Sequence, residues 1–90
     1  MTLQDWDELN SRLDTCVSRL PRLNPQTARD CRRMSETVAQ LLRQADQERV
    51  ICRRRHSVTT RYEQYMQQAQ EALQNLEGHV IMAMLMRKDQ

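Results

Sequence analysis

The sequence predicts an all-α protein, and three observations support that prediction. The 90 residues include one glycine and two prolines, so few residues favour tight turns. Gln, Arg, Leu, Ala, Met and Glu dominate the composition, and their side chains lose little rotamer freedom in a helix. Apolar residues recur every three or four positions, which is the spacing of one helix face. The chain is therefore expected to form a single domain, residues 1–90, built from few, long helices.

The first helix is expected over about residues 2–20, followed by a turn at residues 21–24. Thr2 is the expected N-cap, since its hydroxyl could accept the backbone N–H of Asp5. Pro21 and Pro25 disfavour helical geometry in the residues before them, and Asn24 then reads as the N-cap of the next helix. The apolar stripe of the first helix should hold it against the second, with these anchor residues: Trp6, Leu9, Leu13 and Leu20.

The leading prediction for the rest of the chain is one long helix over about residues 25–86. The fold would then be a helical hairpin with one short and one long heptad-patterned helix, as in an oligomeric coiled coil or helical bundle. No proline or glycine occurs between Pro25 and Gly78. Counted from Cys31, thirteen of the sixteen core heptad positions are apolar, which is the pattern of a coiled coil.

The alternative is a three-helix bundle with a break near residues 57–60. The three polar core positions of the heptad pattern, Glu48, Arg55 and Thr59, fall close together. Thr60 and Glu63 also have capping-box spacing. Against a break, residues 47–60 lack Gly, Pro, Asn and Asp, the residues that form turns at little cost.

The same three polar positions suggest a role in setting register. Buried charges cost several kcal/mol unless they are paired, so we expect Glu48 of one chain to meet Arg55 of another. Polar residues in a coiled-coil core fix alignment and partner choice. The hypothesis is that Glu48, Arg55 and Thr59 specify how the helices of an assembly align.

A long helix would leave its second half without an intrachain partner, which predicts an interface with other helical proteins. The apolar stripe there is three heptad columns wide, so two or more neighbouring helices should cover it. Homo- and hetero-oligomers are both compatible with this pattern. The predicted interface residues are Ile51, Cys52, Val58, Tyr62, Tyr65, Met66, Leu73, Leu76, Val80, Ile81, Met84 and Leu85.

Neither catalysis nor cofactor or metal binding is expected. The sequence contains no Gly-rich loop and no pair of carboxylates on an apolar face. Cys52 and His56 share a helix face, but zinc takes four ligands, commonly supplied in pairs. The other candidates, Cys16, Cys31 and His79, lack paired spacing.

The net charge is +2, and the basic residues are unevenly placed. Residues 27–56 contain eight arginines and four acids, including the run from Arg53 to Arg55. Such a surface could contact phosphates, but no aromatic residues are interleaved with it for base stacking. A solvated helix face is therefore the preferred interpretation, and nucleic acid is not the expected partner.

The sequence thus predicts a non-enzymatic coiled-coil interaction or scaffold subunit that assembles with itself or with other helical subunits. One alternative is a small helical chaperone or adaptor that shields a partner helix, for example in a secretion apparatus; another is a basic helical protein that bridges nucleic acids.

The longest apolar run, residues 80–86, is too short to cross a bilayer. The polar, acidic N-terminus and three unpaired cysteines predict a reducing cytoplasmic or nuclear location.

Overall fold

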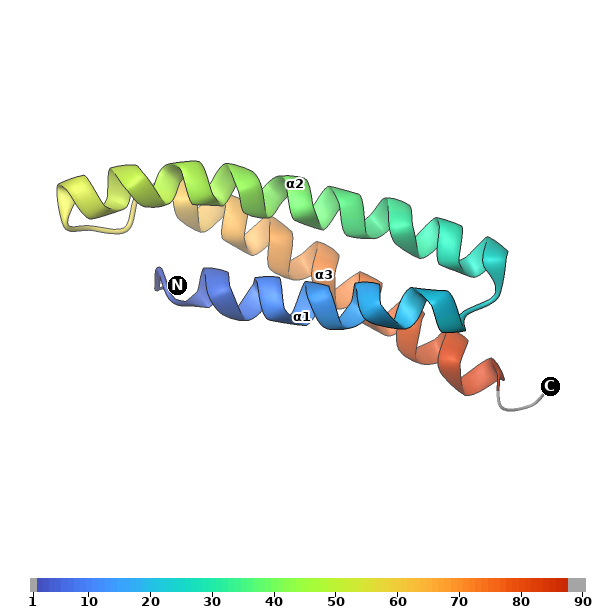
Figure 1. Cartoon of the computed structure of the whole chain (residues 1–90). Helices are drawn as coiled ribbons and strands as arrows, with labels where there is room; N and C mark the ends of the chain where they lie inside the picture. The colour runs from blue at the N-terminus through green and yellow to red at the C-terminus, as the bar shows by residue number, and fades with distance from the viewer. Residues whose placement is uncertain (1, 88–90) are drawn as a thin grey trace.

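The computed structural model describes residues 2–87 as three helices packed side by side, with no strand among them (Figure 1). The helices are α1 (Asp5–Arg19), α2 (Pro25–Arg55) and α3 (Thr60–Arg87), and a single 3₁₀ turn, η1 (Leu20–Arg22), follows α1. Helix α2 runs antiparallel to both α1 and α3, so α1 and α3 point the same way. The bundle measures 53 × 17 × 17 Å. The all-α prediction is confirmed.

The connection between α1 and α2 follows the predicted turn closely. The side chain of Asn24 accepts the backbone N–H of Gln26 at 2.9 Å, and Pro25 occupies the first turn of α2, as expected. The predicted cap of α1 is wrong in detail. The Asp5 carboxylate instead accepts the Thr2 backbone N–H at 2.8 Å, and α1 begins at Asp5.

The prediction of one unbroken helix over residues 25–86 is wrong, and the three-helix alternative is correct. The chain reverses between Arg55 and Thr60, where His56 adopts the left-handed conformation with φ 53° and ψ 33°. The Ser57 N–H donates to the Cys52 carbonyl at 3.1 Å, and the His56 N–H donates to the Arg53 carbonyl at 3.4 Å. These two bonds form a Schellman motif, which satisfies the last carbonyls of α2. Histidine is one of the few residues besides glycine that adopt this conformation with some frequency.

Thr59 begins the third helix. Its hydroxyl accepts the Tyr62 backbone N–H at 3.2 Å, which is the bond of an N-cap. Its own backbone N–H donates to the Cys52 thiol sulfur at 3.4 Å, so the turn is tied to the end of α2. The cap therefore lies one residue before the capping box expected at Thr60 and Glu63.

The core is formed where the apolar faces of all three helices meet, and α3 contributes its central stripe. Helix α2 is its most extensive neighbour, and α1 covers the other side. Fully burying one large apolar side chain contributes about 1.5–3 kcal/mol, so this stripe holds the bundle together. Its members are each exposed by 1% or less: Tyr62, Met66, Ala69, Leu73, Leu76 and Val80.

The left-handed turn makes a specific prediction about His56, whose side chain is exposed. His56→Gly should be more stable than His56→Ala by about 1 kcal/mol, because an added Cβ is unfavourable at positive φ. Denaturant unfolding of the two variants measures the difference. In a continuous helix the order would reverse, since glycine inside a helix costs about 1 kcal/mol relative to alanine.

Candidate interaction surfaces

Half of the predicted interface residues lie inside the bundle. Because α3 folds back on α1 and α2, the expectation that the second half of the chain lacks an intrachain partner is wrong. The side chains concerned are exposed by 1% or less and are closed to another chain unless the bundle opens: Cys52, Tyr62, Met66, Leu73, Leu76 and Val80.

The other predicted interface residues divide between the two ends of the molecule. Tyr65 and Met84 are half-buried and pack against the core. Ile51 lies near the end of α2 and Val58 lies in the turn between α2 and α3, and each is 38% exposed. At the opposite end of α3, Ile81 is 50% and Leu85 is 53% exposed. Of the twelve predicted interface residues, these four are the ones whose side chains are exposed in the folded chain.

The three residues predicted to set register have different environments in the structure. Arg55 is the last residue of α2 and is exposed, so the expected buried arginine is wrong. Glu48 is buried, and its Oε1 lies 3.8 Å from Nη1 of Arg61 on α3 of the same chain. Because the Arg61 side chain is 77% exposed, solvent screens this pair and it contributes little to stability. Thr59 acts as the cap described above.

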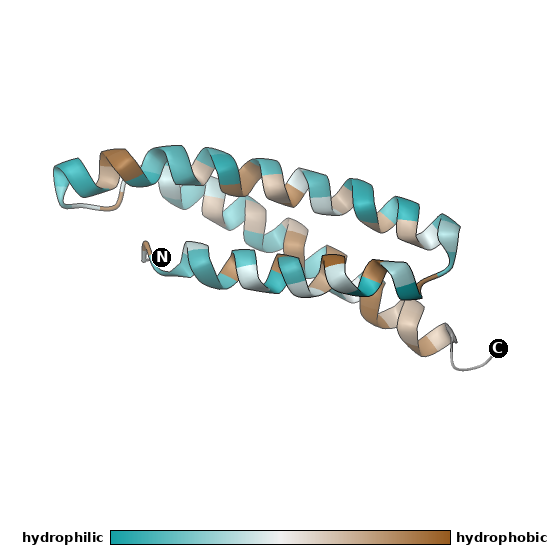
Figure 2. Ribbon diagram, viewed as in Figure 1, coloured by the Kyte–Doolittle hydropathy of each residue, from teal (hydrophilic) through white to brown (hydrophobic). Residues whose placement is uncertain are grey.

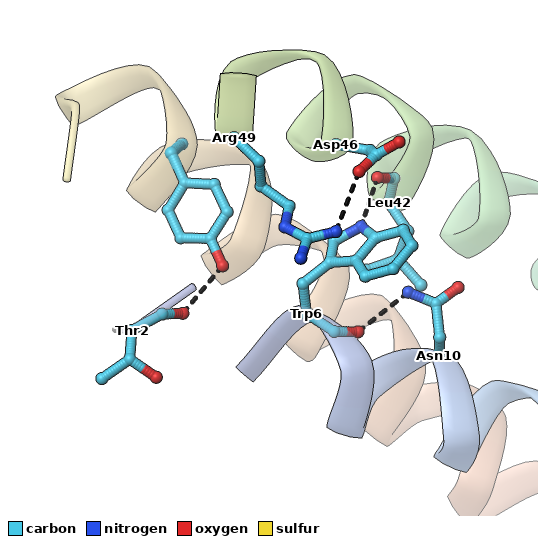
Figure 3. Close-up of polar contacts among 7 residues, drawn as sticks. Thr2, Trp6, Asn10, Leu42, Asp46 and Arg49 are labelled. Atoms are coloured by element: carbon cyan, nitrogen blue, oxygen red, sulfur yellow. Dashed lines mark hydrogen bonds and ion pairs between the residues drawn. The ribbon is translucent and has the colours of Figure 1, made fainter. Parts of the chain in front are cut away.

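Trp6 fastens α1 to α2 by polar contacts as well as by packing (Figure 3). Its indole N–H donates to the Leu42 carbonyl at 2.7 Å, and the Arg49 guanidinium lies 4.3 Å from the ring centroid. Asp46 holds Arg49 in place through a 2.9 Å ion pair. The other predicted anchors, Leu9, Leu13 and Leu20, are buried. Spacing alone gave no sign that Arg49 would cover the indole ring, because the two residues lie on different helices.

Two further contacts link α3 to the beginning of the chain. The Tyr62 hydroxyl donates to the Thr2 carbonyl at 2.8 Å (Figure 3). Burial raises the pKa of Tyr62 to about 12. Farther along, the Arg12 guanidinium pairs with the Glu77 carboxylate at 2.6 and 3.1 Å, and this hydrogen bonding raises the pKa of Arg12. Both contacts join segments that the sequence pattern does not place together.

The last turns of α3 form an exposed hydrophobic surface, which we call the apolar end. It consists of Ile81, Met82, Leu85 and Met86, which are 50%, 58%, 53% and 65% exposed. Figure 2 shows the hydrophobic colouring of this part of α3. A groove of about 590 Å³ lies beside it, lined by Thr27 of α2 and by Gly78, Met82 and Met86 of α3, among others. A Cβ at Gly78 would meet nothing within 4 Å, so the space beside this residue is open.

Within residues 2–87, no three His, Cys, Asp or Glu side chains come together as metal ligands would. Cys16, Cys31 and Cys52 are free and buried. Burial raises the pKa of the Cys16 and Cys31 thiols, which disfavours the nucleophilic thiolate.

None of the helices within residues 2–87 combines the length and hydropathy needed to cross a bilayer.

Comparison of the chain with protein-family models, with curated proteins and with solved structures finds no match.

Two methionines on α3 test the division between core and surface. Met66 is fully buried, whereas Met82 is 58% exposed. Met66→Ala should lower the free energy of unfolding by about 2–5 kcal/mol through lost burial and a cavity. Met82→Ala should change it by less than about 0.5 kcal/mol in dilute protein. Denaturant titration of both variants measures this, and equal losses would contradict the packing of α3.

The raised pKa of Tyr62 predicts that the free energy of unfolding falls at alkaline pH. Its pKa rises from 10.0 in the unfolded chain to about 12 in the fold, so the fold favours the neutral phenol. The stabilisation is complete below pH 10 and is lost as the pH rises from 10 to 12. Tyr62→Phe should cost about 0.5–1.5 kcal/mol at neutral pH, because the bond to Thr2 is lost.

The measurement is the difference in unfolding free energy between the wild type and Tyr62→Phe across this pH range. Taking the difference removes the contribution of the cysteines, which both proteins share. The wild-type advantage should shrink above pH 10. An advantage that stays constant up to pH 12 would show that the phenol is not buried.

Proposed function

We propose that this protein is a non-enzymatic interaction subunit that forms a dimer with a second copy of itself through the apolar end of α3. The observation that supports the proposal is the set of four large apolar side chains, each at least half exposed, on two consecutive turns of one helix. Clustered apolar side chains of this size on a monomer are typical of a protein–protein contact. Methionine suits such a contact, because its flexible side chain adapts to irregular surfaces.

The shape of the apolar end is compatible with pairing between identical copies. Gly78, Met82 and Met86 follow one another at intervals of four residues, so they lie on one face of α3. If two α3 helices cross antiparallel with a two-fold axis at Met82, Gly78 of each chain lies opposite Met86 of the other. The open space beside Gly78 of each chain would then receive the exposed Met86 side chain of the other. A two-fold interface needs this kind of self-complementarity.

The groove beside Gly78 also supports a second candidate, an adaptor that shields the helix of another protein. Its lining combines the apolar Met82, Ala83 and Met86 with the polar Gln74 and Asn75. An amphipathic helix binds in a groove of this composition through its apolar face. In that case the chain would be monomeric alone, and a helical client would become more soluble when co-expressed with it.

Sedimentation velocity over a range of concentrations tests self-assembly. The wild type should form a dimer, and Met82→Glu should weaken association more than about 100-fold, because each subunit would bury a carboxylate in the contact. Val50→Glu is the matched control, since Val50 is 51% exposed but lies near the end of α2 at Arg55, away from the last turns of α3. It should leave the dimer intact. A wild-type monomer at every concentration would contradict the proposal.

A further inference from the structure

The end of the bundle opposite the apolar end carries a cluster of positive charge, which we call the basic tip. It consists of Arg53, Arg54 and Arg55 in the last turn of α2 and Arg61 in the first turn of α3. All four side chains are exposed. Residues 50–63 contain only one acid, Glu63, against these four arginines. The self-assembly proposed above makes no use of this end of the molecule.

The cations of the tip are largely unneutralised by the chain itself. Within residues 2–87, no hydrogen bond or ion pair engages the side chains of Arg53, Arg54 or Arg55. Arg61 approaches Glu48 only at 3.8 Å. By contrast, Arg12 and Arg49 form ion pairs at 2.6 and 2.9 Å. The guanidinium groups of the tip are therefore available to an external anion.

Their arrangement indicates the shape of that anion. Consecutive residues on a helix are about 100° apart, so Arg53, Arg54 and Arg55 spread over roughly 200° around the end of α2. A rod-like partner lying along α2 would contact only one or two of them. A broad anionic surface that meets the bundle end-on can contact all three, together with Arg61 on the neighbouring helix.

Apolar side chains at the tip indicate the chemistry of the surface. Val58 lies in the turn and is 38% exposed, and Ile51 and Val50 follow on α2 at 38% and 51%. Figure 2 shows hydrophobic colouring next to the hydrophilic end of the bundle. A nucleic-acid backbone offers nothing to these side chains, and Tyr62, the nearest aromatic residue, is fully buried and cannot stack on a base. The interface of a lipid bilayer offers both phosphates and hydrocarbon.

We propose that the basic tip docks end-on onto the surface of an anionic lipid bilayer. The arginines contact the headgroup phosphates, and Val58 and Ile51 reach the boundary of the acyl chains. This is a peripheral contact in which no helix crosses the membrane. It lies at the other end of the bundle from the apolar end, so it does not depend on self-assembly.

Co-sedimentation with vesicles tests the proposal. The chain should pellet with phosphatidylcholine vesicles that contain phosphatidylserine but not with phosphatidylcholine alone, and added salt should release it. The triple variant Arg53→Gln/Arg54→Gln/Arg55→Gln should bind roughly 100-fold more weakly, from the attraction of each basic residue to an anionic surface.

The matched control is Arg29→Gln/Arg32→Gln/Arg33→Gln. It removes the same charge from exposed positions at the other end of α2 and should bind like the wild type. Met82→Glu should also bind normally, which separates this proposal from self-assembly. Circular dichroism melting verifies that each variant is folded.

Either of two results would contradict docking of the arginines on an anionic bilayer. One is equal loss of vesicle binding in both triple variants, which would show that only net charge matters. The other is a salt-sensitive shift of duplex DNA with no binding to anionic vesicles, which would assign the tip to nucleic acid. Ile51→Ser/Val58→Ser should weaken vesicle binding while all arginines remain, and unchanged binding by this variant would contradict apolar contact with the bilayer.

Discussion

The reversal of the chain at residues 56–59 determines how the three helices pack. The left-handed conformation of His56 ends α2, and the Thr59 cap begins α3. Only after this reversal can the α3 stripe from Tyr62 to Val80 pack against α1 and α2. Without it, those side chains would need helices from other molecules. The turn therefore decides whether the chain can bury its own core or must assemble to do so.

The elements that the sequence predicts well are those with local signals. The first helix, the proline-bounded turn and the Asn24 cap follow from residue types at adjacent positions, and the structure contains them. The reversal at His56 has a weaker signal, since the turn uses no glycine, proline, asparagine or aspartate. The polar residues at Glu48, Arg55 and Thr59 did mark the region. The heptad pattern continues through it, because the same spacing suits a continuous helix and two antiparallel ones.

The candidate surfaces were partly predictable for the same reason. Ile81 and Leu85 were expected at an interface, and they are exposed because α3 ends beyond the cover of its neighbours. Tyr62 and Leu73 were expected there too, yet they are buried, because apolar spacing identifies a face that must be covered without identifying what covers it. Contacts between distant segments, such as Arg49 over the Trp6 ring, cannot be read from the spacing of apolar residues, because that spacing describes one helix at a time. When the three helices have buried their shared core, one end of the bundle still exposes apolar side chains and the other end exposes arginines. These two ends are the surfaces available to partners.

The distance between the start of α2 and the middle of α3 distinguishes the folded-back bundle from a continuous helix. Gln26 and Gln74 are exposed, and Thr27 and Gln74 line the same groove. Spin labels can be introduced there as non-canonical amino acids, which leaves the buried cysteines in place, and dilution with unlabelled chain suppresses intermolecular pairs. Because packed helices have axes about 8–10 Å apart, the three-helix bundle predicts a label separation below about 25 Å. A separation of about 70 Å, the span of a continuous helix at 1.5 Å per residue, would contradict it.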